Sequence, residues 1–63
     1  MNRKYKFGTD NVLEFTLFGS TVEVKITGPK QRYLKNYSFD SYVEAVREFR
    51  IRVQAQKGRE RLN

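Results

Sequence analysis

The sequence predicts an α+β fold in the order β-β-β-α, in which a three-stranded antiparallel sheet packs on one C-terminal helix. A short fourth strand at the N-terminus is possible. Three observations carry this prediction. Residues 12–27 alternate apolar and polar side chains on either side of a Gly-Ser dipeptide. A Gly-Pro turn then leads into a second alternating stretch at residues 32–39. From residue 40 onward the apolar period changes from two to about three and a half, which is typical of an amphipathic helix.

A β-hairpin is predicted over residues 12–27, and the turn sets its register. Gly19 is the first of two central residues, as in a type II′ turn, because that position needs a positive φ that only glycine adopts freely. A two-residue turn places Leu17 opposite Val22, and further pairs follow outward. Six apolar side chains then share one face of the hairpin: Leu13, Phe15, Leu17, Val22, Val24 and Ile26.

Residues 1–11 allow two interpretations. Tyr5 and Phe7 alternate with Lys4 and Lys6, as in a short edge strand that ends in a turn. The same residues are compatible with a flexible basic N-terminal arm. The sequence leaves both open.

The third strand, residues 32–39, follows the Gly-Pro turn. Its alternation is imperfect, because Leu34 falls on one face while Tyr37 and Phe39 fall on the other. A β-bulge at residues 35 and 36 would turn all three side chains toward the core. The sequence therefore predicts a bulge at that point.

The helix is predicted over residues 41–57. Ser41 and Glu44 match a capping box, with Asp40 as a competing N-cap, and Gly58 is a natural stop. One apolar stripe would face the sheet, and it consists of Tyr42, Ala45, Val46, Phe49 and Val53.

Composition limits the function. The 63 residues suit one small domain, residues 1–63, in which residues 59–63 are predicted to be a flexible tail. The chain contains neither Cys nor His, so disulfides, zinc sites and the usual catalytic triads are excluded. We therefore expect a protein that is not an enzyme and needs no cofactor. No apolar run is long enough to span a membrane, and residues 1–4 do not lead into a signal-peptide core, so the expected compartment is cytoplasmic.

The net charge of +6 is unevenly placed. Residues 1–11 and 47–63 carry net charges of +2 and +4, whereas residues 12–46 are neutral. Such a field attracts polyanions, most often nucleic acid. The sheet face turned away from the helix would be free and polar, with Glu14, Thr16, Glu23, Lys25, Thr27 and Arg32 on it.

Part of the chain resembles the AP2-type and integrase-arm-type DNA-binding domains, which also combine a three-stranded sheet with a C-terminal helix. The likeness lies in the strand at residues 22–26, the strand that follows it, and the run Phe-Asp-Ser at residues 39–41 that precedes an Ala-bearing helix. The chain lacks the family's Trp. The resemblance implies that outward sheet residues, here Lys25, Thr27 and Arg32, enter a DNA major groove.

Two classes of function follow. The first is a nucleic-acid-binding module, with DNA favoured over RNA, of the kind that phages and other mobile elements carry. Its candidate contacts are the basic and polar surface residues Lys25, Thr27, Lys30, Arg32, Arg47, Arg50, Lys57, Arg59 and Arg61.

The alternative is a small protein-binding adaptor or inhibitor that acts through its sheet face or edge, or a homodimer. Four Tyr and five Phe exceed what a minimal core requires, and exposed aromatic residues favour protein interfaces. Exposure of Phe18, Tyr33 and Tyr5 together would favour this second class. Dispersal or burial of the three would leave the basic surface as the main feature.

Overall fold

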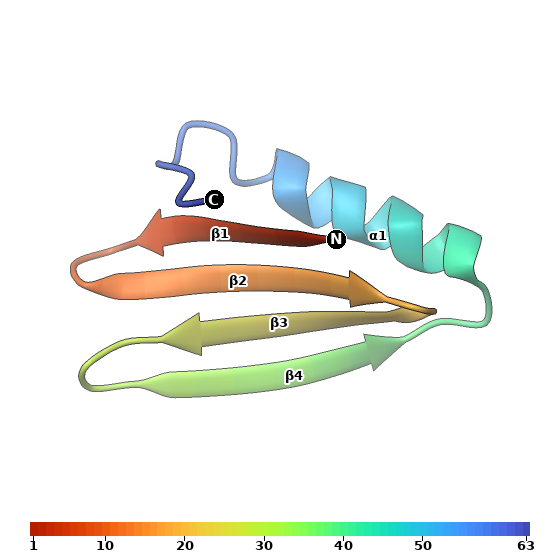
Figure 1. Ribbon diagram of the computed structural model, residues 1–63, viewed down its shortest axis with the longest axis horizontal. Coiled ribbons are helices and arrows are strands. Elements are labelled where there is room, and N and C mark those ends of the chain that lie inside the picture. The colour runs from red at the N-terminus through yellow and green to blue at the C-terminus, as the bar shows by residue number, and fades with distance from the viewer.

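Four antiparallel strands form one open sheet, and a single helix lies across part of one of its faces (Figure 1). The computed structural model describes all residues from 1 to 63. The α+β order is confirmed, and the fourth strand left open by the sequence is present. In sheet order the elements are β1 (Asn2–Phe7), β2 (Asn11–Phe18), β3 (Thr21–Thr27) and β4 (Arg32–Ser38), followed by α1 (Tyr42–Gln54).

The central hairpin has the predicted register. Leu17 pairs with Val22, and Phe18 with Thr21 beside the turn. Gly19 has a φ of 58°, whereas the φ of Ser20 is not positive, as a type II′ turn requires. The turn and the alternation pattern therefore specify the same pairing.

Replacing Gly19 with Val is expected to lower the free energy of unfolding by about 1–3 kcal/mol. A Cβ at this position would meet no atom within 4 Å, so the cost comes from the backbone alone. Urea denaturation of the variant, with Ser20→Val as the matched control, measures it. Equal midpoints for the two variants would contradict a type II′ turn.

The N-terminal segment is a strand rather than a free arm. Tyr5 pairs with Leu13 and is 5% exposed. The strand is extended by Met1, whose carbonyl oxygen accepts from the Leu17 amide at 2.8 Å. Burial of Tyr5 on the helix side explains why this segment joins the sheet, because an aromatic side chain gains most from removal from water.

The predicted bulge in β4 is absent. The β3–β4 ladder runs without interruption from Thr21↔Ser38 to Thr27↔Arg32. Tyr37 therefore faces the helix side as expected, but Leu34 faces away from it and is 61% exposed. The prediction that Leu34 joins the core is wrong, because an unbroken ladder of backbone hydrogen bonds outweighs the burial of one leucine.

The helix begins as predicted and ends earlier. The hydroxyl of Ser41 accepts from the Glu44 amide at 3.2 Å, so Ser41 is the N-cap rather than Asp40. Helical geometry stops at Ala55, and tighter turns continue to Gly58, which has a φ of 97°. Within the predicted apolar stripe, Tyr42 is 57% exposed, because it lies on the first turn of the helix.

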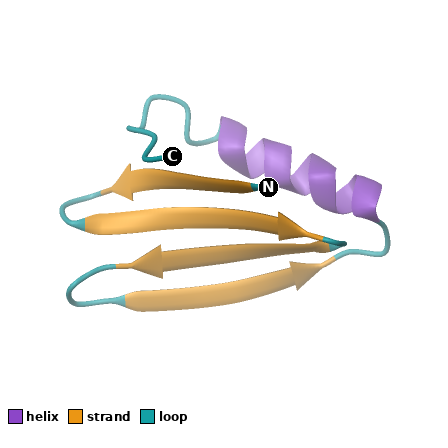
Figure 2. Ribbon diagram, in the orientation of Figure 1, coloured by secondary structure: helices purple, strands orange, loops and turns teal.

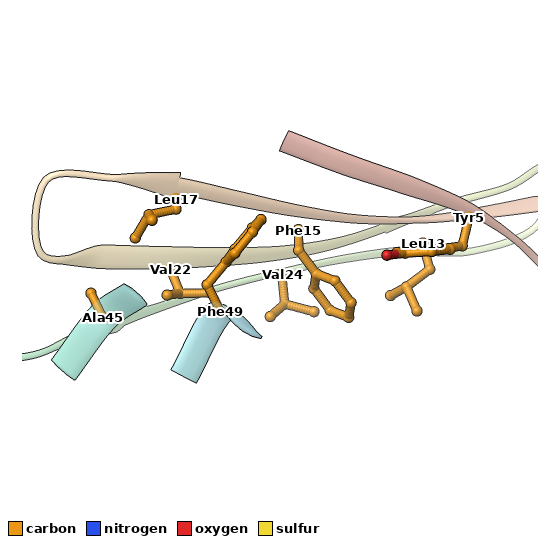
Figure 3. Packing of buried hydrophobic residues seen from close by; sticks show 8 residues of the cluster. All are labelled: Tyr5, Leu13, Phe15, Leu17, Val22, Val24, Ala45 and Phe49. Atoms are coloured by element: carbon orange, nitrogen blue, oxygen red, sulfur yellow. The ribbon is translucent and has the colours of Figure 1, made fainter. Parts of the chain in front are cut away.

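Eight residues form the hydrophobic core, and only two of them come from the helix (Figure 3). Ala45 and Phe49 lie against the sheet near Leu17 and Val22, as Figure 3 shows. The full set is Tyr5, Leu13, Phe15, Leu17, Val22, Val24, Ala45 and Phe49. The helix packs on β2 and β3, so the outer strand β4 remains largely exposed.

Residues 59–63, which the sequence predicts to be a flexible tail, lie along the outer edge of β1. The Lys6 amide donates to the Glu60 carbonyl at 2.9 Å, and the Leu62 amide donates to the Lys4 carbonyl at 2.8 Å. Figure 2 shows this loop-coloured segment beside the first strand. These bonds satisfy backbone groups that an edge strand otherwise leaves open.

Candidate nucleic-acid interface

The sheet face turned away from the helix is polar and carries most of the charged strand residues. Strand alternation places every second residue of each strand on this face, which we call the open face. The register aligns them in rows across the four strands. The row nearest the β1–β2 and β3–β4 turns reads Lys6, Val12, Thr27 and Arg32, and the next row reads Lys4, Glu14, Lys25 and Leu34.

Three of the predicted contacts lie together on the open face. Lys25, Thr27 and Arg32 are all exposed. The strand β1 adds Lys4 and Lys6 to the same face, and neither lysine is among the contacts that the sequence predicts. The alternation of these lysines with Tyr5 and Phe7 was the signal, but it identifies the face only once β1 is known to be a strand.

The two acidic residues of the open face lie away from the row nearest the turns. Glu14 Oε2 accepts a 2.7 Å hydrogen bond from Asn2 Nδ2, which also donates to Thr16 Oγ1 at 2.8 Å. Glu23 pairs with Thr16 in the following row. Neither Lys25 nor Arg32 forms an ion pair with these carboxylates, since the single ion pair of the structure lies on α1.

Lys30 extends the basic end of the sheet. It lies in the β3–β4 turn, whose residues share a shallow hollow with Thr9, Asp10 and Asn11 of the β1–β2 connection. Both turns lie at the same end of the sheet (Figure 1). Lys30 is exposed there, next to the row that contains Lys6 and Arg32.

The two helix arginines among the predicted contacts lie apart from the open face. Arg47 and Arg50 are exposed and line a groove along one flank of α1. The opposite flank carries the ion pair, in which Arg52 Nε lies 3.0 Å from Glu48 Oε1. Helix and open face are on opposite sides of the sheet, so one flat ligand cannot contact both.

The remaining predicted contacts belong to the C-terminal segment. The Arg59 guanidinium carbon lies 4.8 Å from the centroid of the Phe7 ring, and Arg59 Nε donates to Gln56 Oε1 at 2.7 Å. Arg61 pairs with Tyr5, so its side chain is on the helix side of the sheet. Lys57 is exposed in the turns after the helix.

A second basic cluster, which sequence reasoning missed, lies on the helix side of β4. The ring centroid of Tyr37 is 4.4 Å from the Arg52 guanidinium carbon and 5.1 Å from Lys35 Nζ. Desolvation raises the pKa of Tyr37, but its neighbour Tyr33 and the positive charges of Lys35 and Arg52 lower it, so that the pKa lies below the ordinary value. No pattern in the sequence pairs Arg52 with β4.

Comparison with known proteins leaves the function to be argued from this geometry. No family model, curated protein or solved structure matches the chain. The helix α1 is too short and too polar to cross a membrane. No group of three or more carboxylates lies close enough to hold a metal ion. What the structure brings together is an open face with four cations, a groove on the helix and a Tyr37-centred cluster.

Proposed function

We propose that the protein is a non-enzymatic nucleic-acid-binding module that contacts DNA through the open face. One observation carries the proposal. The register aligns Lys6 with Arg32 across the sheet, in a row without any acidic residue, and Lys4 and Lys25 flank it in the next row. None of the four forms an ion pair, so their charge is available to phosphates.

The width of the sheet suits a duplex. Neighbouring strands are about 4.8 Å apart, so the three spacings from β1 to β4 amount to about 14 Å. The major groove of B-DNA is about 12 Å wide. Lys6 and Arg32, at the two outer strands, can therefore reach the phosphates on either side of the groove.

DNA is favoured over single-stranded RNA by the placement of the aromatic residues. Recognition of RNA by a sheet relies on aromatic rings that stack with bases on the binding face. Tyr33 and Tyr37 lie on the helix side of β4, and Phe18 is at the far end of the open face. On the open face itself, the end that carries the cations has no aromatic ring.

The placement of the aromatic residues also argues against the alternative of a protein-binding adaptor. Tyr5 is buried, whereas Phe18 and Tyr33 are exposed on opposite faces of the sheet. They form no common aromatic patch, which supports the basic surface as the main feature. One specific observation still favours a protein partner, namely the groove on α1.

A salt titration tests the DNA proposal. The double variant Lys6→Gln/Arg32→Gln is expected to bind a random duplex more weakly, and its slope of log K against log salt should fall by about 0.9 for each phosphate that the variant no longer neutralises. Fluorescence anisotropy between about 50 and 200 mM salt, a range in which phosphate contacts lose much of their affinity, measures both quantities. The double variant Arg47→Gln/Arg50→Gln removes the same charge from the helix and serves as the matched control.

Two results would contradict the proposal. One is the absence of binding by the unmodified chain at the lowest salt concentration. The other is an equal decrease in affinity for the open-face and helix variants, which would mean that net charge rather than the open face determines binding. In the first case the protein-binding adaptor becomes the better supported function.

A further inference from the structure

One flank of α1 carries exposed apolar residues that the fold does not use. The groove on this flank is lined mainly by Tyr42, Val43, Val46, Arg47, Arg50 and Ile51. Val43 is 65% exposed, and Tyr42 and Ile51 are 57% exposed. The residues that line the groove follow one another at intervals of one, three and four positions, so they lie on one side of the helix. This side faces away from Ala45 and Phe49, the two helix residues of the core.

Of the apolar residues on this flank, Val46 packs against the domain core, whereas Val43 and Ile51 do not. The core side of α1 is formed by Ala45 and Phe49, and the flank toward β4 is formed by Glu48 and Arg52. A flank that meets only water is normally polar throughout. An apolar stripe left exposed on so small a chain therefore indicates an interaction surface.

The charges around the groove define the partner. Both charged residues that line it are arginines, Arg47 and Arg50, and no acidic residue lines it. A second copy of the chain would bring like charges together across a two-fold axis, which disfavours a dimer through this groove. A nucleic acid offers phosphates but no apolar side chains to cover Val43 and Ile51.

We propose that this groove docks an acidic amphipathic helix of another protein. The partner presents an apolar stripe to Val43 and Ile51 and two carboxylates to the arginines. Arg47 and Arg50 are three residues apart, about 4.5 Å along the axis, so the carboxylates lie about one turn apart. The 13 residues of α1 measure about 20 Å, which a partner helix of similar length matches. Every residue that lines the groove belongs to α1 or its C-cap, so the two helices would pack side by side.

A peptide selection tests the proposal without knowledge of the natural partner. The full chain is immobilised and a random helical peptide library is displayed against it, with the double variant Val43→Ser/Ile51→Ser as the counter-selection. The enriched peptides are expected to carry an apolar stripe and two acidic residues three or four positions apart. Their affinity should fall about tenfold or more for the double variant and for Arg50→Glu.

Charge exchange provides the decisive control. A selected peptide in which the acidic residue facing Arg50 is replaced by Lys is expected to bind Arg50→Glu about tenfold better than it binds the unmodified chain. Lys25→Gln, on the open face, should leave peptide affinity unchanged. Because Val43, Ile51 and Arg50 are exposed, each variant should retain the melting temperature of the unmodified chain, and circular dichroism checks this.

Each contrary outcome would overturn the proposal. These outcomes are a selection that enriches nothing, enriched peptides without acidic residues, or peptides that bind Val43→Ser/Ile51→Ser equally well. A tenfold decrease in DNA affinity in that variant would assign the groove to nucleic acid. A dimer in sedimentation velocity that dissociates in that variant would assign it to a second copy of the chain.

Discussion

Replacing Phe49 with Ala is expected to lower the free energy of unfolding by about 3–5 kcal/mol. Phe49 is 3% exposed and is one of two helix residues in the core. Domains of this length have total stabilities of only about 3–9 kcal/mol, so the change removes a large share of the stability and should move the denaturation midpoint to a much lower urea concentration. Circular dichroism during urea denaturation measures the decrease. Phe49→Leu, which keeps most of the volume, should cost less than about 1.5 kcal/mol and remain measurable.

The matched control for this change is Ile51→Ala on the same helix. Ile51 is 57% exposed, so its truncation is expected to change stability by no more than about 0.5 kcal/mol. A similar decrease for both variants would mean that the helix packs on the sheet with a different side. The comparison therefore tests the orientation of α1 as well as its contribution.

Replacing Tyr5 with Ala is expected to cost about 3 kcal/mol or more. The Tyr5 ring is 5% exposed, and its centroid lies 6.2 Å from that of Phe15, at an interplanar angle of 59°. Aromatic pairs in such tilted arrangements contribute beyond the area they bury. Thermal and urea denaturation measure the change, which a flexible N-terminal arm would not show.

Tyr33→Ala is the control for Tyr5, because it removes the same side chain from a largely exposed site on β4. Tyr33 is 45% exposed and is expected to contribute far less than Tyr5. Coincident denaturation curves for the two variants would show that β1 does not carry part of the core. The DNA proposal would then lose the alignment of Lys4 and Lys6 with the other strands.

Several features follow from local sequence. The hairpin register is specified twice, by the Gly19 turn and by alternation, and the structure confirms it in every predicted pair. The Ser41 cap is confirmed as well, and Glu48 and Arg52, four residues apart on the helix, form an ion pair. These interactions connect residues that are at most a short hairpin apart, so nearby side chains are sufficient to define them.

Other features depend on contacts between distant parts of the chain. Whether residues 1–11 form an arm or a strand depends on the burial of Tyr5 against β2. The course of residues 59–63 depends on the open edge of β1. The sequence also suggested a bulge that would bury Leu34, whereas the unbroken β3–β4 ladder leaves that side chain in solvent.

The candidate interfaces likewise depend in part on local sequence and in part on contacts between distant parts of the chain. Lys25, Thr27 and Arg32 can be assigned to one face from alternation within the hairpin and the strand after it. The addition of Lys4 and Lys6 requires the pairing of β1, and the exposed flank of α1 requires knowledge of where the helix crosses the sheet. Local patterns specify which side chains share a face of one element. Tertiary packing decides which faces are covered, because that depends on how much apolar area each alternative arrangement buries.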